Sequence, residues 1–287
     1  MKRLLVVAGV SVLLASQASP MAAQQPTFSS KLEAVRVDVL VLDSGKVVPG
    51  LRPEDFEVRD NSVLQSVDLV SFQQIPLNVV LALDVSASVF GERLEHLQSA
   101  GRTLLDHLAK DDRSALLTFS HVVALREALT GNVESVRAAL GDVQPAGDTA
   151  LIDGSYTALM LDASGGGRNL VIVFSDGLDT SSWLSPDRVL EAAKRSDMVV
   201  YGVFPRGDDE PKFLENLSEL TGGAVVKIES TKNLSATFLQ ILEEFRQRYL
   251  ISYSPTGVAK NGWHRLDVRV KGRRASVKAR PGYQAGS

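Results

Sequence analysis

The sequence of 287 residues contains no cysteine. This absence excludes disulfide bonds, catalysis by a thiol, metal sites built from thiolates and a lipid-modified cysteine behind a leader segment. Export from the cell without disulfides is compatible with a bacterial envelope. The hydrophobic core must then supply the stability of the fold.

The sequence has no excess of positive charge and only four histidines. The chain has 31 Lys and Arg residues against 34 Asp and Glu residues, which gives a formal net charge of −3. This balance argues against nucleic acid or anionic lipid as the main partner. The motif of a nucleophilic serine, G-x-S-x-G, is absent. The four histidines are scattered and are expected to be surface or boundary residues rather than metal ligands: His96, His107, His121 and His264.

The first residues have the pattern of a signal peptide. Met1-Lys2-Arg3 precede the apolar stretch "LLVVAGVSVLLAS", which is too short to span a bilayer comfortably. We expect residues 1–23 to be removed after Ala23, so that the mature protein is secreted or periplasmic and makes no stable membrane insertion. Loss of the two basic residues changes the formal charge from −3 to −5. An uncleaved membrane anchor is the alternative.

The pattern of apolar and polar residues in the remaining chain changes twice. Residues 31–72 alternate apolar and polar side chains around turn signals, which predicts short β strands. From residue 78, apolar runs typical of buried parallel strands alternate with helical patterns, and the tail returns to β alternation. The predicted strands are 78–83, 114–120, 169–176, 198–204 and 224–229, and the predicted helices are 92–109, 133–140, 150–162, 186–196, 211–220 and 234–249.

These patterns predict an α/β fold with a Rossmann-like, doubly wound and mostly parallel sheet in residues 76–250. The flanking β segments, residues 24–75 and 251–287, are each too small to bury a core alone. We therefore expect them to pack together as a small β-sandwich-like unit, or to dock on the α/β domain.

Oxygen-bearing side chains gather at the predicted carboxyl edge of the sheet, where open α/β sheets bind ligands. The stretch "LALDVSAS" ends a buried strand with Asp84, Ser86 and Ser88. A second strand leads to Asp176, and the segment "GDTALIDG" supplies Thr149. Alternate residues of an extended chain point the same way, so the first three oxygens can face one point. Oxygen ligands suit hard cations such as Mg²⁺, Mn²⁺ or Ca²⁺ and argue against zinc or copper.

This constellation resembles the metal-ion-dependent adhesion site, or MIDAS, of von Willebrand factor type A (VWA) domains. That site consists of D-x-S-x-S, a distant threonine and a distant aspartate. The resemblance covers about residues 76–250 and implies direct coordination by Ser86, Ser88 and sometimes Thr149. It implies that Asp84 and Asp176 act through waters or by direct carboxylate contact. The flanks resemble a bacterial exported VWA-related family known from acidobacterial genomes, whose biochemical role is largely unassigned.

Several residues near this edge allow more than one interpretation. Ser86 and Ser88 could instead be helix caps, and Asp176 part of an ordinary turn. Asp148 and Asp179 could tune the site through hydrogen bonds to its ligands, although an ordinary loop acid is the simpler reading of Asp179. Trp183 could anchor a partner or fold back on the helix that begins near Pro186.

The main functional hypothesis is a binding protein, not an enzyme. A divalent cation, Mg²⁺ first and Mn²⁺ or Ca²⁺ as alternatives, would accept an acidic side chain of a protein partner at an open coordination position. Envelope scaffolding with a vestigial metal site is a second hypothesis. A metal-assisted hydrolase is a third, against which stands the lack of an evident general base in the predicted site.

Overall fold

A computed structural model of the protein describes residues 34–72, 75–161, 166–207 and 211–286. The chain divides into two units, Met1–Leu32 and Glu33–Ser287, and the description concerns the second. The predicted signal peptide and its cleavage point therefore lie outside the described residues. None of the helices in the described part is long and apolar enough to cross a membrane.

A six-stranded sheet forms the centre of the α/β domain, in the order β11-β10-β9-β6-β7-β8. All neighbouring pairs are parallel except β7 and β8. Every residue of β6 and β9 is buried, as expected for apolar runs covered on both faces. The strands are β6 (Leu77–Asp84), β7 (Arg113–Phe119), β8 (Val123–Thr130), β9 (Arg168–Phe174), β10 (Val199–Pro205) and β11 (Ala224–Ile228).

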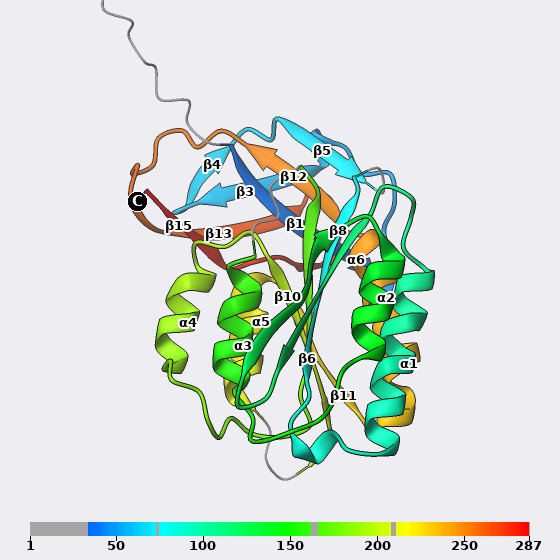
Figure 1. Ribbon diagram of the computed structural model, residues 1–287. Helices are drawn as coiled ribbons and strands as arrows, with labels where there is room; N and C mark the ends of the chain where they lie inside the picture. Colours follow the sequence, from blue (N-terminus) through cyan, green and yellow to red (C-terminus); the bar gives the residue numbers. More distant parts are fainter. Residues whose placement is uncertain (1–33, 73–74, 162–165, 208–210, 287) are drawn as a thin grey trace, which may run out of the picture. The chain divides into compact units, whose positions relative to one another are not determined.

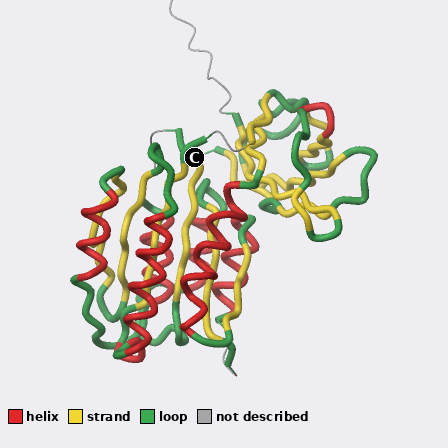
Figure 2. The backbone as a smooth tube through the Cα atoms, turned by 90° about the vertical axis from the view of Figure 1, so that its right-hand side faces the viewer, coloured by secondary structure: helices red, strands yellow, loops and turns green. Residues whose placement is uncertain are grey.

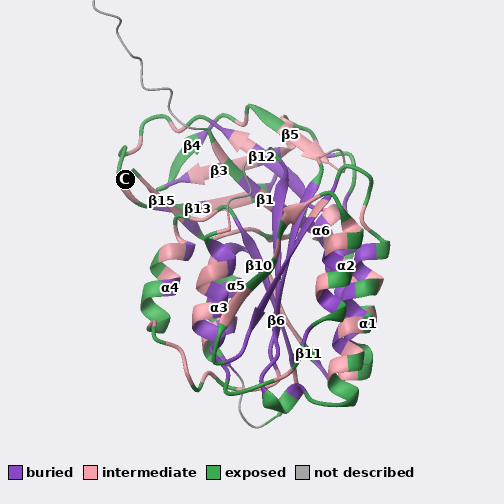
Figure 3. Cartoon of the chain, in the orientation of Figure 1, coloured by how far each residue is buried: buried purple, intermediate pink, exposed green. Residues whose placement is uncertain are grey.

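Helices cover both faces of this sheet (Figures 1 and 2). One face packs against α1 (Glu92–Asp106), α2 (Val133–Gly141) and α6 (Leu234–Arg246). The other packs against α3 (Leu151–Leu159), α4 (Pro186–Ala193) and α5 (Lys212–Thr221). Figure 3 shows the resulting pattern, with buried residues along the sheet and on the inner sides of the helices. Short 3₁₀ turns are η1 (Pro53–Asp55), η2 (Ala87–Val89) and η3 (Thr231–Asn233).

The two β segments at the ends of the chain combine into a flanking β sandwich. In one sheet β1 pairs with β12, and in the other β3 pairs with β13, so each sheet contains strands from both segments. Side chains from both sheets share one apolar core. The strands are β1 (Val35–Asp43), β2 (Lys46–Val47), β3 (Phe56–Asp60), β4 (Val63–Gln65), β5 (Leu69–Phe72), β12 (Tyr249–Tyr253), β13 (Gly262–Val270), β14 (Ser276–Lys278) and β15 (Gly282–Ala285).

The structure confirms the predicted fold class and adds one strand to the central sheet. The sequence patterns assigned no element to residues 121–132, yet β8 occupies most of this segment as an antiparallel edge strand. None of its residues is buried, so it lacks the apolar run that marks the other strands. The strand β12 begins at Tyr249, slightly before the boundary expected at residue 250.

A buried ion pair joins the sandwich to the α/β domain. Arg168, at the start of β9, donates from Nε to Asp38 Oδ1 of β1 at 2.6 Å and from Nη2 to the carbonyl oxygen of Phe245 at 2.9 Å. The Arg168 side chain is 2% exposed and the Asp38 side chain 9% exposed. Each charge therefore depends on the other, because water cannot replace a lost partner at this position.

Replacing Asp38 by alanine should destabilise the protein by about 3 kcal/mol, because the Arg168 guanidinium would remain buried without its counter-charge. Urea unfolding followed by circular dichroism measures the change. Asp43→Ala is the matched control, since Asp43 is exposed at the end of the same strand. A midpoint for Asp38→Ala equal to that of the control would contradict a structural role for the pair.

Candidate metal centre

The predicted site residues converge where the carboxyl ends of β6 and β9 lie side by side. The two strands are parallel neighbours, with Leu83 paired to Phe174. The chain leaves β6 toward β7 on one side, and β9 lies on the other, so this is the topological switch point of the sheet. Asp84 ends β6, and Asp176 follows β9 by two residues.

Three of the predicted oxygen ligands form a continuous chain of contacts. Ser86 Oγ lies 3.0 Å from Ser88 Oγ, and Ser88 Oγ donates to Asp176 Oδ1 at 2.6 Å. The Asp176 side chain is only 1% exposed, whereas Ser88 is exposed. The site therefore has a buried carboxylate beneath a hydroxyl group that solvent can reach.

Asp84 lies below this chain and is fully buried. Its Oδ1 accepts from the Ser86 backbone N–H at 2.8 Å, and its Oδ2 accepts from Ser175 Oγ at 2.6 Å. Burial raises the pKa of the Asp84 carboxyl, and hydrogen bonds from Ser175 and Ser86 counteract part of this rise. A divalent cation nearby would favour the charged carboxylate further.

The alternative of helix-capping serines does not hold. Ser86 precedes η2, but its side chain makes no capping hydrogen bond. The residue before α1 is Gly91, whose φ of 76° turns the chain into the helix. Both serine hydroxyls instead take part in the chain of contacts that reaches Asp176.

Thr149 lies beside this cluster and is buried. A Cβ atom built on Gly177 would lie 4.0 Å from Thr149 Oγ1, so the hydroxyl faces the residue after Asp176. The backbone of Thr149 is held by the loop after β9: its N–H donates to Thr180 Oγ1 at 3.0 Å, and its carbonyl accepts from the Thr180 N–H at 2.8 Å. The segment just before Thr149 is also bonded to the loop that carries Ser86 and Ser88, because the Ala87 N–H donates to the Gly147 carbonyl at 2.9 Å.

The two additional acids behave differently from each other. Asp148 is exposed and makes no hydrogen bond or ion pair to another described residue. Asp179 accepts from the Ile152 N–H at 3.1 Å and from Ser182 Oγ at 2.5 Å, so it holds the loop against the first turn of α3. Asp179 therefore makes no direct contact with the predicted ligands, but it is not an ordinary solvent-exposed loop acid either, because it stabilises the loop.

Trp183 projects into solvent and does not fold back on α4, since it is 95% exposed. Its loop is anchored by Asp153 of α3, which accepts from the backbone N–H groups of Trp183 at 2.9 Å and Leu184 at 3.0 Å. A hollow of about 380 Å³ beside the tryptophan is lined by Trp183, Asp153, Tyr156 and His121, among others.

Sequence reasoning missed three residues that organise this region. Ser175 supports Asp84, Asp153 anchors the tryptophan loop, and Arg93 contacts Asp176, with 2.7 Å between Arg93 Nη1 and Asp176 Oδ2. Ser175 could have been suspected from its place just before Asp176. Arg93 and Asp153 resemble ordinary surface residues of helices, and no pattern in the sequence distinguishes them.

The donor set fits a hard divalent cation. Its groups are hydroxyl and carboxylate oxygens, which Mg²⁺ and Ca²⁺ prefer. Neighbouring ligands around an octahedral Mg²⁺ lie about 2.9 Å apart, because each lies about 2.0–2.1 Å from the ion. The separations of 3.0 Å and 2.6 Å along Ser86, Ser88 and Asp176 are close to this spacing. No cluster of three or more His, Cys, Asp or Glu side chains that could hold a metal occurs among the described residues, so a cation at this position would also need hydroxyl ligands.

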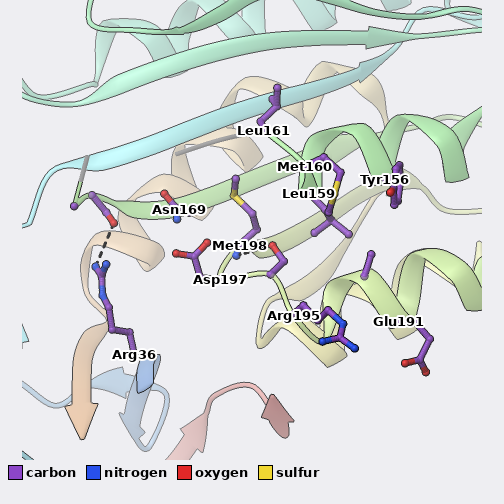
Figure 4. Close-up of a pocket in the computed structure, with 14 residues that line it drawn as sticks. Arg36, Tyr156, Leu159, Met160, Leu161, Asn169, Glu191, Arg195, Asp197 and Met198 are labelled. Atoms are coloured by element: carbon purple, nitrogen blue, oxygen red, sulfur yellow. Dashed lines mark hydrogen bonds between the residues drawn. The ribbon is translucent and has the colours of Figure 1, made fainter. Parts of the chain in front are cut away.

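A larger pocket lies at the opposite end of the sheet (Figure 4). It measures about 960 Å³ and includes Arg36, Asn169 and Met198 in its lining. Asn169 lies near the start of β9 and Met198 just before β10, so these are the amino ends of the strands. None of the predicted site residues lines this pocket.

A model of the von Willebrand factor type A domain matches residues 78–240, more than half of the chain. The chain belongs to this family. The VWA match includes the two strands and the loops that form the candidate metal centre, and VWA proteins commonly mediate protein–protein interaction. VWA domains also typically bind a divalent cation at the MIDAS.

Two relatives show how widely this domain is distributed. Inter-alpha-trypsin inhibitor heavy chain H2 of Mus musculus is 25% identical over 213 residues, which are 66% of this chain and 22% of that protein. The chain therefore spans about a fifth of the length of that relative. A UPF0353 protein of Mycolicibacterium gilvum is 28% identical over 259 residues, which are 73% of this chain and 75% of that protein.

Solved structures support the fold. A von Willebrand factor type A protein from Catenulispora acidiphila aligns with a TM-score of 0.56 and 14% identity, over 86% of this chain and 75% of that one. Proximal thread matrix protein 1 from the mussel byssus, described with a zinc-occupied MIDAS motif, aligns with a TM-score of 0.56 and 16% identity, over 65% of this chain and 49% of that one.

Replacing Asp153 by alanine should free the tryptophan loop without unfolding the domain, because two backbone N–H groups lose their acceptor. We expect amide hydrogen exchange at residues 183–184 to become at least about tenfold faster. Exchange measured by mass spectrometry detects this, and Asp187→Ala, an exposed acid in the first turn of α4, serves as the control. Exchange unchanged from the natural protein would show that Asp153 does not anchor the loop.

Proposed function

We propose that the protein is a secreted or periplasmic binding protein whose VWA domain holds a divalent cation and, through it, an acidic side chain of a partner protein. The observation that carries this proposal is the chain of oxygens from Ser86 through Ser88 to Asp176 at the switch point of the sheet. Asp84 accepts a hydrogen bond from the Ser86 N–H, and the Thr149 hydroxyl lies near Gly177, the residue after Asp176.

The character of the ligands supports a role in capturing carboxylates. Ser86 and Ser88 offer neutral hydroxyl groups, and the Asp84 carboxylate is already engaged by Ser86 N–H and Ser175 Oγ. A cation held by few negative charges keeps much of its affinity for a further carboxylate. Because Ser88 is exposed, that carboxylate can approach from solvent.

Exposed apolar side chains near the site support a protein partner over a small anion. Phe90 is two residues beyond Ser88 and 78% exposed, and Leu178, close after Asp176, is also exposed. Trp183 stands farther along the same loop. Large aromatic residues on a surface favour protein–protein contacts, where they bury more area than a small ion could cover.

Mg²⁺ is the cation that we propose first, with Mn²⁺ and Ca²⁺ as alternatives, because all candidate ligands are oxygens. Zinc also belongs among the metals to test. The mussel thread protein carries zinc in its MIDAS motif.

Two other functions remain as alternatives to be separated by experiment. In an envelope scaffold the metal site would be vestigial and the flanking β sandwich would mediate assembly. A metal-assisted hydrolase would need a general base beside the site. The basic group that contacts Asp176 is the Arg93 guanidinium, which stays protonated and cannot accept a proton. We therefore propose binding rather than catalysis.

Replacing Ser88 by alanine should weaken Mg²⁺ binding at least about a hundredfold. Loss of a residue that only hydrogen-bonds to a metal ligand already lowers metal affinity by roughly 10–100-fold, and Ser88 is proposed as a ligand itself. Asp84→Ala should have at least as large an effect. Isothermal calorimetry on the mature chain measures the affinities. Ser88 is exposed, so its variant should fold even if the Asp84 variant does not.

The matched control for this titration is Asp148→Ala, which removes an exposed acid beside Thr149. Its affinity should equal that of the natural protein. Absence of both heat and thermal shift with Mg²⁺, Mn²⁺, Ca²⁺ and Zn²⁺ would favour the scaffold. Metal-dependent turnover in a broad hydrolase panel that disappears in Asp176→Asn would favour the enzyme.

Replacing Trp183 by alanine should reduce partner binding about tenfold while leaving the Mg²⁺ affinity unchanged, because the side chain touches a partner and not the cation. A pull-down from envelope extract, with Mg²⁺ and with EDTA, identifies proteins whose capture needs the metal. Trp263→Ala, which removes the other tryptophan from β13, is the control. Equal capture by both variants would remove Trp183 from the proposed interface.

A further inference from the structure

Arg93, in the first turn of α1, contacts two residues of the candidate metal centre at once. Its Nη1 donates to Asp176 Oδ2 at 2.7 Å and to the backbone carbonyl of Ser88 at 3.2 Å. The proposal that follows rests on the cation site proposed above and concerns how that site is regulated.

The ion pair joins an exposed charge to a buried one. Arg93 is 53% exposed, whereas the Asp176 side chain is 1% exposed. One oxygen of Asp176 accepts from Ser88 Oγ and the other from Arg93, so both oxygens of the carboxylate are engaged. Among the described residues, no other basic side chain forms an ion pair with Asp176.

This arrangement has a direct electrostatic consequence. A divalent cation that contacts Ser88 Oγ and Asp176 would lie within a few ångströms of the guanidinium, and two positive charges at such a distance repel each other. The positive charge of Arg93 also offsets part of the negative charge of Asp176, so the carboxylate attracts a metal ion less strongly while the ion pair is intact. Conversely, without a metal, Arg93 neutralises the carboxylate of Asp176 beside the second buried acid, Asp84.

We propose that Arg93 is a resident cation that competes with the divalent metal for Asp176 and so sets the metal concentration at which the site fills. Removal of Arg93 has two effects of opposite sign. The metal-free protein loses stability, and the affinity for metal rises. A residue that only shaped the loop would, when lost, lower both quantities, so the opposite signs distinguish the two roles.

The test uses the mature chain with Arg93→Gln, Arg93→Lys and the control Arg102→Gln, which changes an exposed arginine on the same helix. Calorimetry with Mg²⁺ and with Mn²⁺ gives the affinities, and thermal unfolding in EDTA gives the stability. For Arg93→Gln we expect affinity about tenfold higher for both metals and a Tm lower by about 2–4 °C in EDTA. Arg93→Lys should lie between it and the natural protein, and Arg102→Gln should match the natural protein.

The outcomes separate this proposal from the proposed function. If the natural protein binds metal and Arg93→Gln binds it no more tightly, the competition is refuted and the proposed metal site stands. The highest metal concentration is about 10 mM, which exceeds the Kd of ordinary weak cation sites. If Arg93→Gln binds metal at this concentration and the natural protein does not, the competition stands and cation-dependent binding by the natural chain is refuted. If neither protein binds metal, both proposals fall.

Discussion

The candidate metal centre depends on one buried carboxylate. Asp84 receives a hydrogen bond from the backbone of the loop that follows its own strand and another from Ser175, which follows the neighbouring strand. These two contacts tie the carboxyl ends of β6 and β9 together. A fully buried carboxylate is stable only while such partners are in place, so the loop geometry and the charge of Asp84 depend on each other.

Polar contacts at the other end of the domain connect it to the flanking β sandwich in the same manner. Arg168 lies at the start of β9, the strand that leads to Asp176, and its charge is matched by Asp38 of β1. Arg248, just before β12, is fully buried and donates to the Tyr201 hydroxyl of β10 at 2.6 Å and to the Gly222 carbonyl at 2.6 Å. Strands of the central sheet are thus held at both ends, and we infer that the sandwich steadies the sheet on which the site is built.

The sequence predicts those parts of the fold and site that leave a local pattern. Apolar runs revealed the buried parallel strands, and the alternation of Asp84, Ser86 and Ser88 revealed a set of oxygens facing one point. The strand β8 left no such pattern, because none of its residues is fully buried: it pairs with β7 at the edge of the sheet, and only Val123 and Leu129 pack against the core. Arg93 and Asp153 escaped prediction for a related reason. Their roles arise from contacts with residues 83 and 30 positions away, and their helices would accept many other side chains at these positions.

The competition proposed for Arg93 changes how metal and partner would act together. A cation held by neutral hydroxyls and by a carboxylate shared with arginine is bound weakly on its own, and a carboxylate from a partner would supply the missing negative charge. Linkage requires that a partner which strengthens metal binding is itself bound more strongly in the presence of metal, by the same factor. The Arg93 guanidinium, which contacts Asp176 and is 53% exposed, would attract that carboxylate too. Weak retention of the cation would therefore make its occupancy depend on the partner, and a complex would form only where metal and an acidic partner are present together.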